Sequence, residues 1–86
     1  MSTKISSAGN TLSSAYSALM EMGYAVSVST DGKSFRGQKA GCTLIADDPL
    51  TMLGLAKLYE LRGENWRPTD AEVDDFIEFI NAPKLV

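Results

Sequence analysis

Apart from its carboxylates, the sequence has few side chains of the kinds that perform acid–base or nucleophilic chemistry. It contains no histidine and one cysteine, Cys42. Without an imidazole, it lacks the usual general base, the usual activator of a serine or cysteine nucleophile, and any histidine-containing metal site. One thiol can form neither an intramolecular disulfide nor a thiolate zinc site, so we expect Cys42 to be a small buried residue of a sheet. We therefore predict a protein that is not an enzyme, with no catalytic residues, no metal and no cofactor.

Two groups of carboxylates remain as candidates for a chemical role. Asp47 and Asp48 precede a proline at the expected start of a helix, where they serve as N-cap and as favourable charge at the helix N-terminus. Asp74, Asp75 and Glu78 share one side of another expected helix, which contains no base. This second group has two interpretations: an ordinary solvated surface, or a docking surface for a basic protein. A divalent metal site is a weaker third, because one helix side rarely supplies enough converging oxygen ligands.

The only tryptophan precedes an arginine in the segment between two expected helices, as Trp66-Arg67. These residue types are among the most enriched at the energetic centres of protein interfaces. Alternatively, the Trp66 ring covers the core beneath the loop, and Arg67 pairs with Glu64 or Asp70. On the first interpretation, the predicted protein-binding site is one continuous surface. Its residues are Trp66, Arg67, Asp74, Asp75 and Glu78.

Charge is distributed unevenly along the sequence, whose net charge is −3. Residues 1–46 contain four bases and two acids, whereas residues 47–86 contain four bases and nine acids. Three of the bases, Lys33, Arg36 and Lys39, fall on an expected hairpin. The solvent-facing side of that hairpin is expected to have no aromatic residue on which a nucleotide could stack. With an acidic second half as well, the sequence predicts no nucleic-acid partner.

Start and stop signals delimit three expected helices. The first covers residues 11–22, with Asn10 as its N-cap and Gly23 in a left-handed conformation after its end. The second begins at Pro49, which needs no hydrogen bond at the first helical position, and stops at Arg62. Apolar residues surround about two-thirds of this second helix, and we therefore place it at the centre of the fold.

The third expected helix begins at Thr69, which forms a capping box with Glu72, and it ends by Pro83. Its apolar stripe consists of Val73, Phe76, Ile77, Phe79 and Ile80. In the second helix, Gly54 costs roughly 1 kcal/mol relative to alanine. We predict that Gly54 permits a close approach of the backbone to another element.

Three strands are expected between the first two helices. Residues 24–30 alternate apolar and polar side chains, and residues 42–46 form a further strand. After the first strand, Asp31-Gly32 predicts a two-residue type I′ turn, which needs positive φ at both positions. This turn fixes the register of the hairpin. The pairs expected opposite each other are Val28 with Phe35, on the buried side, and Ser27 with Arg36, on the solvent side.

Together these elements predict an α+β fold. It is a small α-β-β-β-α-α domain in which a three-stranded antiparallel meander is packed on one face by helices. The domain covers residues 11–83 and follows a flexible N-terminal tail, residues 1–10, which is rich in serine and glycine.

The order helix, three strands, helix is similar to that of the double-stranded RNA-binding domain. That family contacts phosphates with a basic N-terminus on its last helix. The matching position in this sequence reads Asp47-Asp48-Pro49. The resemblance therefore implies a shared order of elements without RNA binding.

These observations predict a small, soluble, acidic protein-binding module that docks a basic protein partner. Bacterial and phage chains of this size and acidity often act as inhibitors, immunity proteins, antitoxins or adaptors, and this association suggests the same type here. The alternative is a homo-oligomeric structural or scaffold protein with no catalytic activity, for instance a homodimer. No apolar run approaches the ~20 residues that cross a membrane. Since no signal peptide is recognised either, we expect a cytoplasmic location and no membrane partner.

Overall fold

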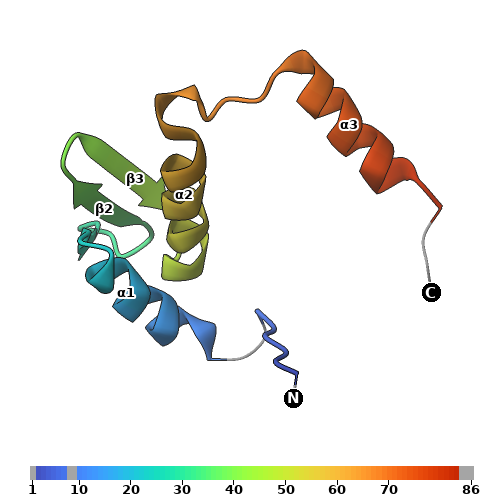
Figure 1. The fold of residues 1–86 in the computed structure, drawn as a ribbon. Coiled ribbons are helices and arrows are strands. Elements are labelled where there is room, and N and C mark those ends of the chain that lie inside the picture. Colours follow the sequence, from blue (N-terminus) through green and yellow to red (C-terminus); the bar gives the residue numbers. More distant parts are fainter. Residues whose placement is uncertain (1, 8–9, 84–86) are drawn as a thin grey trace.

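The computed structural model of the protein describes residues 2–7 and 10–83 (Figure 1). Its elements in chain order are α1 (Thr11–Glu21), β1 (Ala25–Val28), β2 (Phe35–Lys39), β3 (Cys42–Ala46), α2 (Pro49–Arg62), the 3₁₀ helix η1 (Gly63–Asn65) and α3 (Asp70–Asn81). This order confirms the predicted α+β fold with the arrangement α-β-β-β-α-α. Residues 2–7 form no helix or strand, and residues 1, 8 and 9 of the predicted tail lie outside the described residues.

The three strands form an antiparallel sheet in the order β1-β2-β3. Both predicted pairs are confirmed, because Val28 lies opposite Phe35 and Ser27 lies opposite Arg36. Alternation along β3 places Leu44 on the buried face of the sheet, whereas the neighbouring Ile45 is exposed. The hydrophobic pattern therefore selects the register that the structure shows.

The predicted type I′ turn is wrong, although its register is right. Gly32 has φ +73°, but Asp31 does not have positive φ, and a type I′ turn needs both. Instead the backbone N–H of Gly32 donates to the carbonyl oxygen of Ser29 at 2.9 Å, which closes a four-residue turn. The Asp31 carboxylate accepts hydrogen bonds from the Ser29 hydroxyl and from the Lys33 backbone N–H, and these lower the pKa of Asp31. Because the Asp31 carboxylate accepts the hydrogen bond from the Lys33 backbone N–H, the turn forms without positive φ at Asp31.

Helices α1 and α2 cover one face of the sheet and enclose the core. Leu19 of α1 and Met52 and Ala56 of α2 are completely buried. Helix α2 approaches the sheet closely at Gly37 of β2, where a Cβ atom would lie 2.7 Å from the sulfur of Met52. The close approach predicted at Gly54 is wrong, because nothing lies within 4 Å of the position a Cβ would take there.

The ends of α1 follow the sequence signals in part. Gly23 has φ +96°, as predicted for the residue after the helix. Asn10 immediately precedes the helix, but its side chain makes no capping hydrogen bond within the described part of the chain. The N-terminus of α1 is therefore less completely capped than its C-terminus.

Helix α3 extends away from the rest of the molecule (Figure 1). It is joined to α2 through η1 and residues 66–69. In the part of the chain that the structure describes, no other helix or strand packs against α3. We use "body" below for residues 10–65, which contain the sheet, α1, α2 and η1, and "arm" for α3.

Substituting Gly32 tests the turn. We expect Gly32→Val to lower the free energy of unfolding by about 1–2 kcal/mol, since a β-branched residue held at positive φ is strained. Gly32→Asn is the matched control, because asparagine tolerates the left-handed region, and it should cost clearly less. Urea unfolding followed by circular dichroism measures both. Equal stability of the Val and Asn variants would show that the strain is absent.

Two further glycines should respond with opposite sign to the same substitution. Gly54→Ala adds a methyl group in open space on a helix and should raise the free energy of unfolding by up to ~1 kcal/mol. Gly37→Ala places a methyl group against Met52 and should lower it by about 1–3 kcal/mol through overpacking. The same urea titration measures both, and stabilisation by Gly37→Ala would contradict the packing described above.

Candidate functional site

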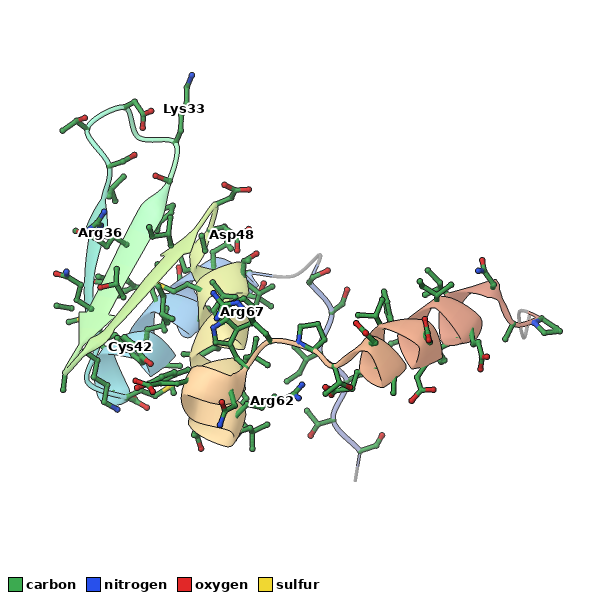
Figure 2. The ribbon with its side chains drawn as sticks, turned by 90° about the horizontal axis from the view of Figure 1, so that it is seen from above. Lys33, Arg36, Cys42, Asp48, Arg62 and Arg67 are labelled. Atoms are coloured by element: carbon green, nitrogen blue, oxygen red, sulfur yellow. The ribbon has the colours of Figure 1, made fainter. Side chains whose placement is uncertain are left out.

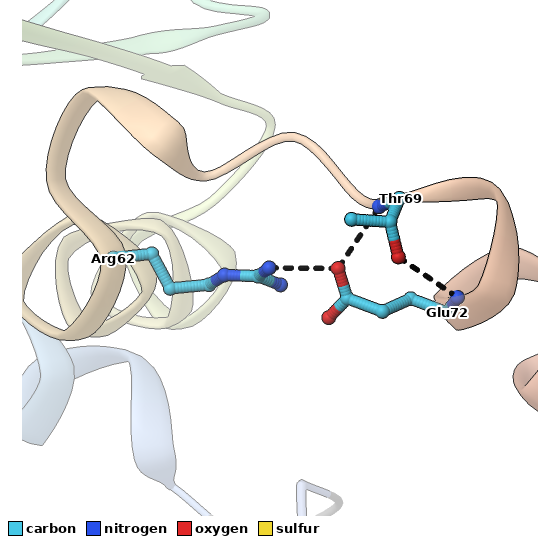
Figure 3. A network of polar contacts seen from close by, with 3 residues as sticks. All are labelled: Arg62, Thr69 and Glu72. Atoms are coloured by element: carbon cyan, nitrogen blue, oxygen red, sulfur yellow. Dashed lines mark hydrogen bonds and ion pairs between the residues drawn. The ribbon is translucent and has the colours of Figure 1, made fainter.

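The arm begins with a complete capping box, as predicted (Figure 3). The Thr69 hydroxyl oxygen accepts from the backbone N–H of Glu72 at 3.2 Å, and the Thr69 backbone N–H donates to Glu72 Oε1 at 2.9 Å. Each bond satisfies a donor that the first helical turn would otherwise leave without a partner. The arm is therefore a formed helix at its first turn, although it stands apart from the body.

Glu72 also joins the arm to the end of α2. Arg62 Nη2 donates to Glu72 Oε1 at 2.8 Å, and both side chains are partly exposed (Figure 3). The hydrogen bond from Arg62, followed by that from the Thr69 backbone, lowers the pKa of Glu72 to about 2. An ion pair this exposed contributes little to stability, so we regard its main effect as geometric. It connects the first turn of the arm to the C-terminal end of α2.

The apolar stripe of the arm lies on the surface. Val73 is 41% exposed, Ile77 is 47% exposed and Phe76 is 61% exposed. Phe79 and Ile80 are exposed too. A stripe at positions i, i+3 and i+4 is the face that a helix normally buries. Among the described residues, no other helix or strand packs against this stripe.

The three acidic residues of the predicted site lie on the other side of the arm. At 100° per residue, Asp74, Asp75 and Glu78 are grouped away from the stripe, and all three are exposed. Within residues 2–7 and 10–83 the structure shows no ion pair for any of them. The acidic side therefore faces solvent, as both sequence interpretations require.

Trp66 and Arg67 are brought together at the base of the arm. The Arg67 guanidinium carbon lies 4.8 Å from the centre of the Trp66 ring, within the range of a cation–π interaction. Trp66 is 43% exposed, so its ring is on the surface and not in the core. Arg67 stacks on this ring, and the structure shows no ion pair from Arg67 to Glu64 or Asp70 among the described residues.

An apolar pocket lies beside this stacked pair, and sequence reasoning did not identify it. Its volume is about 530 Å³, and it is open to solvent. The pocket lies between β3, α2 and the segment after η1. Its walls include Leu44, Leu55, Leu58 and Tyr59, and Trp66 and Arg67 line its edge. The one sequence signal for it was the wide apolar surface of α2, which exceeds what the sheet and α1 cover.

Cys42 lies in the wall of the same pocket. It is half-buried at the start of β3, on the side of the sheet that faces the helices. The prediction of a small buried residue is therefore correct for the face but not for the degree of burial. As the single thiol of the chain, Cys42 provides a chemical label at this pocket.

The predicted site residues form two surfaces in the structure. One is the Trp66–Arg67 pair at the pocket, and the other is the acidic side of the arm. Among residues 2–7 and 10–83, no ion pair or side-chain hydrogen bond joins the pair to the acidic side of the arm. Figure 2 shows Arg67 beside α2, whereas α3 extends away from it.

The bases of the hairpin do not form a single patch. Lys33 lies at the tip (Figure 2). Arg36 and Lys39 are three residues apart in β2, so strand alternation places them on opposite faces of the sheet. The Lys39 ammonium lies 5.4 Å from the centre of the Tyr24 ring. These bases therefore offer no common surface for a polyanion.

Over residues 2–7 and 10–83, no three carboxylate, thiol or imidazole side chains gather in an arrangement that could hold a metal ion. In the same residues, none of the helices has the length and apolar character to span a membrane. Comparison of the chain with known protein families, with curated proteins and with solved structures found no match.

The Arg62–Glu72 ion pair predicts how the Glu72 carboxyl group titrates and how stability depends on pH. Since the folded-state pKa of Glu72 is lowered to about 2 from an ordinary value of 4.5, the pair's stabilisation is fully present above pH 4.5. It is lost as the pH falls from 4.5 towards 2. Arg62→Gln should move the Glu72 pKa up towards its ordinary value, measured by NMR titration of the side-chain carboxyl group.

Lys57→Gln is the matched control for this titration. It removes the separate exposed ion pair between Lys57 and Glu60, whose atoms lie 3.3 Å apart. The Glu72 pKa should not change in this variant. An ordinary Glu72 pKa in the unsubstituted protein would show that the arm is not tied to α2 by this pair in solution.

Proposed function

We propose that this protein is a non-catalytic protein-binding module that presents α3 to its partner as a ready-formed amphipathic helix. The observation that carries the proposal is the exposure of the apolar stripe of the arm at Val73, Phe76 and Ile77. A helix whose apolar side faces water gains free energy only when another surface covers that side. A binding partner is the simplest source of that surface.

The stripe has the spacing that helix-in-groove recognition uses. Val73, Phe76 and Ile77 occupy positions i, i+3 and i+4, which are the anchor positions of helices that bind in apolar grooves. Fully burying each such side chain is worth roughly 1.5–3 kcal/mol. A short isolated helix is marginal in water. The capping box supports the arm's first turn, which reduces the ordering that a partner must bring about.

The charge of the arm favours a partner with a basic rim around its groove. Asp74, Asp75 and Glu78 lie on the side of the arm away from the stripe, and they would stay exposed near the rim of such a groove when the stripe is buried. Charges at the rim of an interface mainly raise the association rate and make it depend on salt. A small acidic module that offers one helix in this way fits the inhibitor, immunity-protein, antitoxin or adaptor type, acting in the cytoplasm.

The second candidate function is a homo-oligomeric structural or scaffold protein without catalytic activity. A specific observation favours it, since the same chain carries an exposed apolar helix and an open apolar pocket. The exposed apolar helix of one copy could therefore bind in the open apolar pocket of another. The two candidates use the same stripe and differ in what covers it.

Substituting the stripe tests the proposed function. Phe76→Gln with Ile77→Gln should leave the unfolding midpoint of the body nearly unchanged, because the arm packs against none of its elements. Binding to the partner should weaken by roughly 100-fold or more, since two anchors each worth over about 1.4 kcal/mol are lost. Surface plasmon resonance with a partner isolated on the unsubstituted protein measures the rates, and the loss should appear mainly as faster dissociation.

Reversing the acidic side to Asp74→Lys, Asp75→Lys and Glu78→Lys is the complementary variant. It should slow association and weaken its salt dependence, with less effect on dissociation. Ala71→Gln, on the arm but away from the stripe, is the neutral control and should bind normally. Unchanged binding by the Phe76/Ile77 variant would remove the arm from consideration, and a large fall in its unfolding midpoint that does not depend on protein concentration would show that α3 belongs to the core.

A further inference from the structure

The apolar pocket beside Trp66 is open to solvent, and the chain itself contains a segment of matching chemistry. We infer that the arm of one copy docks in the pocket of a second copy, and that the exchange is reciprocal. This inference rests on the proposed function of α3 as a ligand helix and names the partner as this same chain. Each copy would then give a helix and receive one, which forms a closed two-fold dimer.

The pocket suits apolar side chains carried on a helix. Its volume of about 530 Å³ lies in the range of roughly 300–1,000 Å³ that ligand sites in proteins occupy. The walls come from Leu44, which is almost fully buried, and from Leu55 and Leu58, which are half-buried. Half-buried leucines facing an open pocket still have apolar surface to cover. Phe76 and Ile77 are side chains of the kind that would cover it.

Two copies could cover each other's stripes by pairing arm with arm or by docking each arm in the other copy's pocket, and charge favours the second arrangement. The arm, residues 70–81, contains five acids and no base, whereas residues 10–69 contain six bases and six acids. Pairing two arms side by side would bring two strongly acidic helices together, and like charges repel. Docking the arm on residues 10–69, which are neutral overall, avoids this repulsion. The edge of the pocket includes Arg67 as well as Glu64, and the stacking on Trp66 holds the Arg67 guanidinium there.

The connection between body and arm favours docking between copies over docking within one chain. Only residues 66–68 separate η1 from the N-cap of α3. Pro68 fixes its own φ and restricts Arg67 to extended conformations. The ion pair between Arg62 and Glu72 ties the first turn of the arm to the end of α2, with the arm directed away from the body (Figures 1 and 3). Short, restrained hinges of this kind promote exchange of an element between copies.

Crosslinking through Cys42 tests the inference, because the only thiol of the chain lies in the pocket wall. One copy carries Cys42→Ser with Val73→Cys, and the other is the unsubstituted chain with a mass tag. The two are mixed and treated with a short bismaleimide. We expect a crosslink between Cys42 of the tagged copy and the thiol introduced at position 73, identified by peptide mass spectrometry.

The control for this crosslink is a copy with Cys42→Ser and Ala71→Cys, whose thiol lies away from the stripe on the same helix. Its yield should be lower by roughly tenfold, the factor that corresponds to ~1.4 kcal/mol of preference. A single chain with Val73→Cys and the native Cys42 tests docking within one chain. If that chain crosslinks internally and the mixture does not crosslink, the arm closes on its own pocket and the inference is overturned.

Oligomeric state gives an independent measurement on the full chain. Sedimentation equilibrium should show a dimer, with the dissociation constant raised by roughly tenfold or more by Phe76→Gln with Ile77→Gln, or by Leu58→Gln in the pocket. Mixing these two variants restores one intact contact, from the sound arm of the Leu58→Gln copy to the sound pocket of the other. The mixture should therefore dimerise more strongly than either variant alone. Circular dichroism confirms that each variant is folded.

The outcomes separate this inference from the proposed function. A monomer at the highest soluble concentration, or a dimer that neither variant weakens, overturns the inference. If the protein is monomeric and the Phe76/Ile77 variant loses a foreign partner, the proposed function stands and the second copy is excluded. If the protein is monomeric and that variant binds as before, both proposals fail.

Discussion

The contact between Met52 and the sheet at Gly37 is the constraint on which the rest of the body depends. Without a side chain on the middle of β2, α2 can lie close to the sheet, and Met52 and Ala56 become completely buried there. This contact also fixes the rotation of α2 about its own axis. With Met52 turned to the sheet, Leu55 and Leu58 face the space beside β3, where they line the pocket. The pocket is thus a consequence of how the core is packed.

A chain this short has more apolar side chains than its body can enclose, since a domain of about 60–90 residues buries only about 60% of its unfolded surface. Part of the excess lies in the pocket and part on the stripe of the arm centred on Val73 and Phe76, and further exposed apolar side chains lie elsewhere, as at Leu12, Tyr16 and Met20 of α1. Scattered apolar residues on a surface need no explanation, but gathered ones mark contacts with other molecules. The gathering of apolar side chains on one side of the arm is what supports a binding role.

Local sequence signals predicted most of the fold. The capping box at Thr69 and the register at Val28 and Phe35 depend on residues close in the chain, and the structure confirms both. The turn type at Asp31 was wrong because a side-chain acceptor replaced a backbone conformation. The Arg62–Glu72 ion pair, the Met52–Gly37 contact and the pocket join residues ten or more positions apart, which no periodicity encodes. For the same reason, the stripe on α3 indicated an apolar face without indicating that the body would leave it uncovered.

Because the arm packs against no element of the body, selection for folding of the body and selection for recognition by the arm act on different residues. Residues that determine whether the body folds, such as Leu19 and Met52, lie outside the arm, and the proposed anchors Val73, Phe76 and Ile77 lie within it. Local unfolding free energies differ between parts of a protein that share few buried contacts. The arm should therefore be able to lose and regain its helix while the body stays intact, with rapid amide exchange in one and slow exchange in the other. Substitutions in α3 would then alter the proposed binding at little cost to the folding of the body, which leaves this helix free to diverge faster than the rest of the chain.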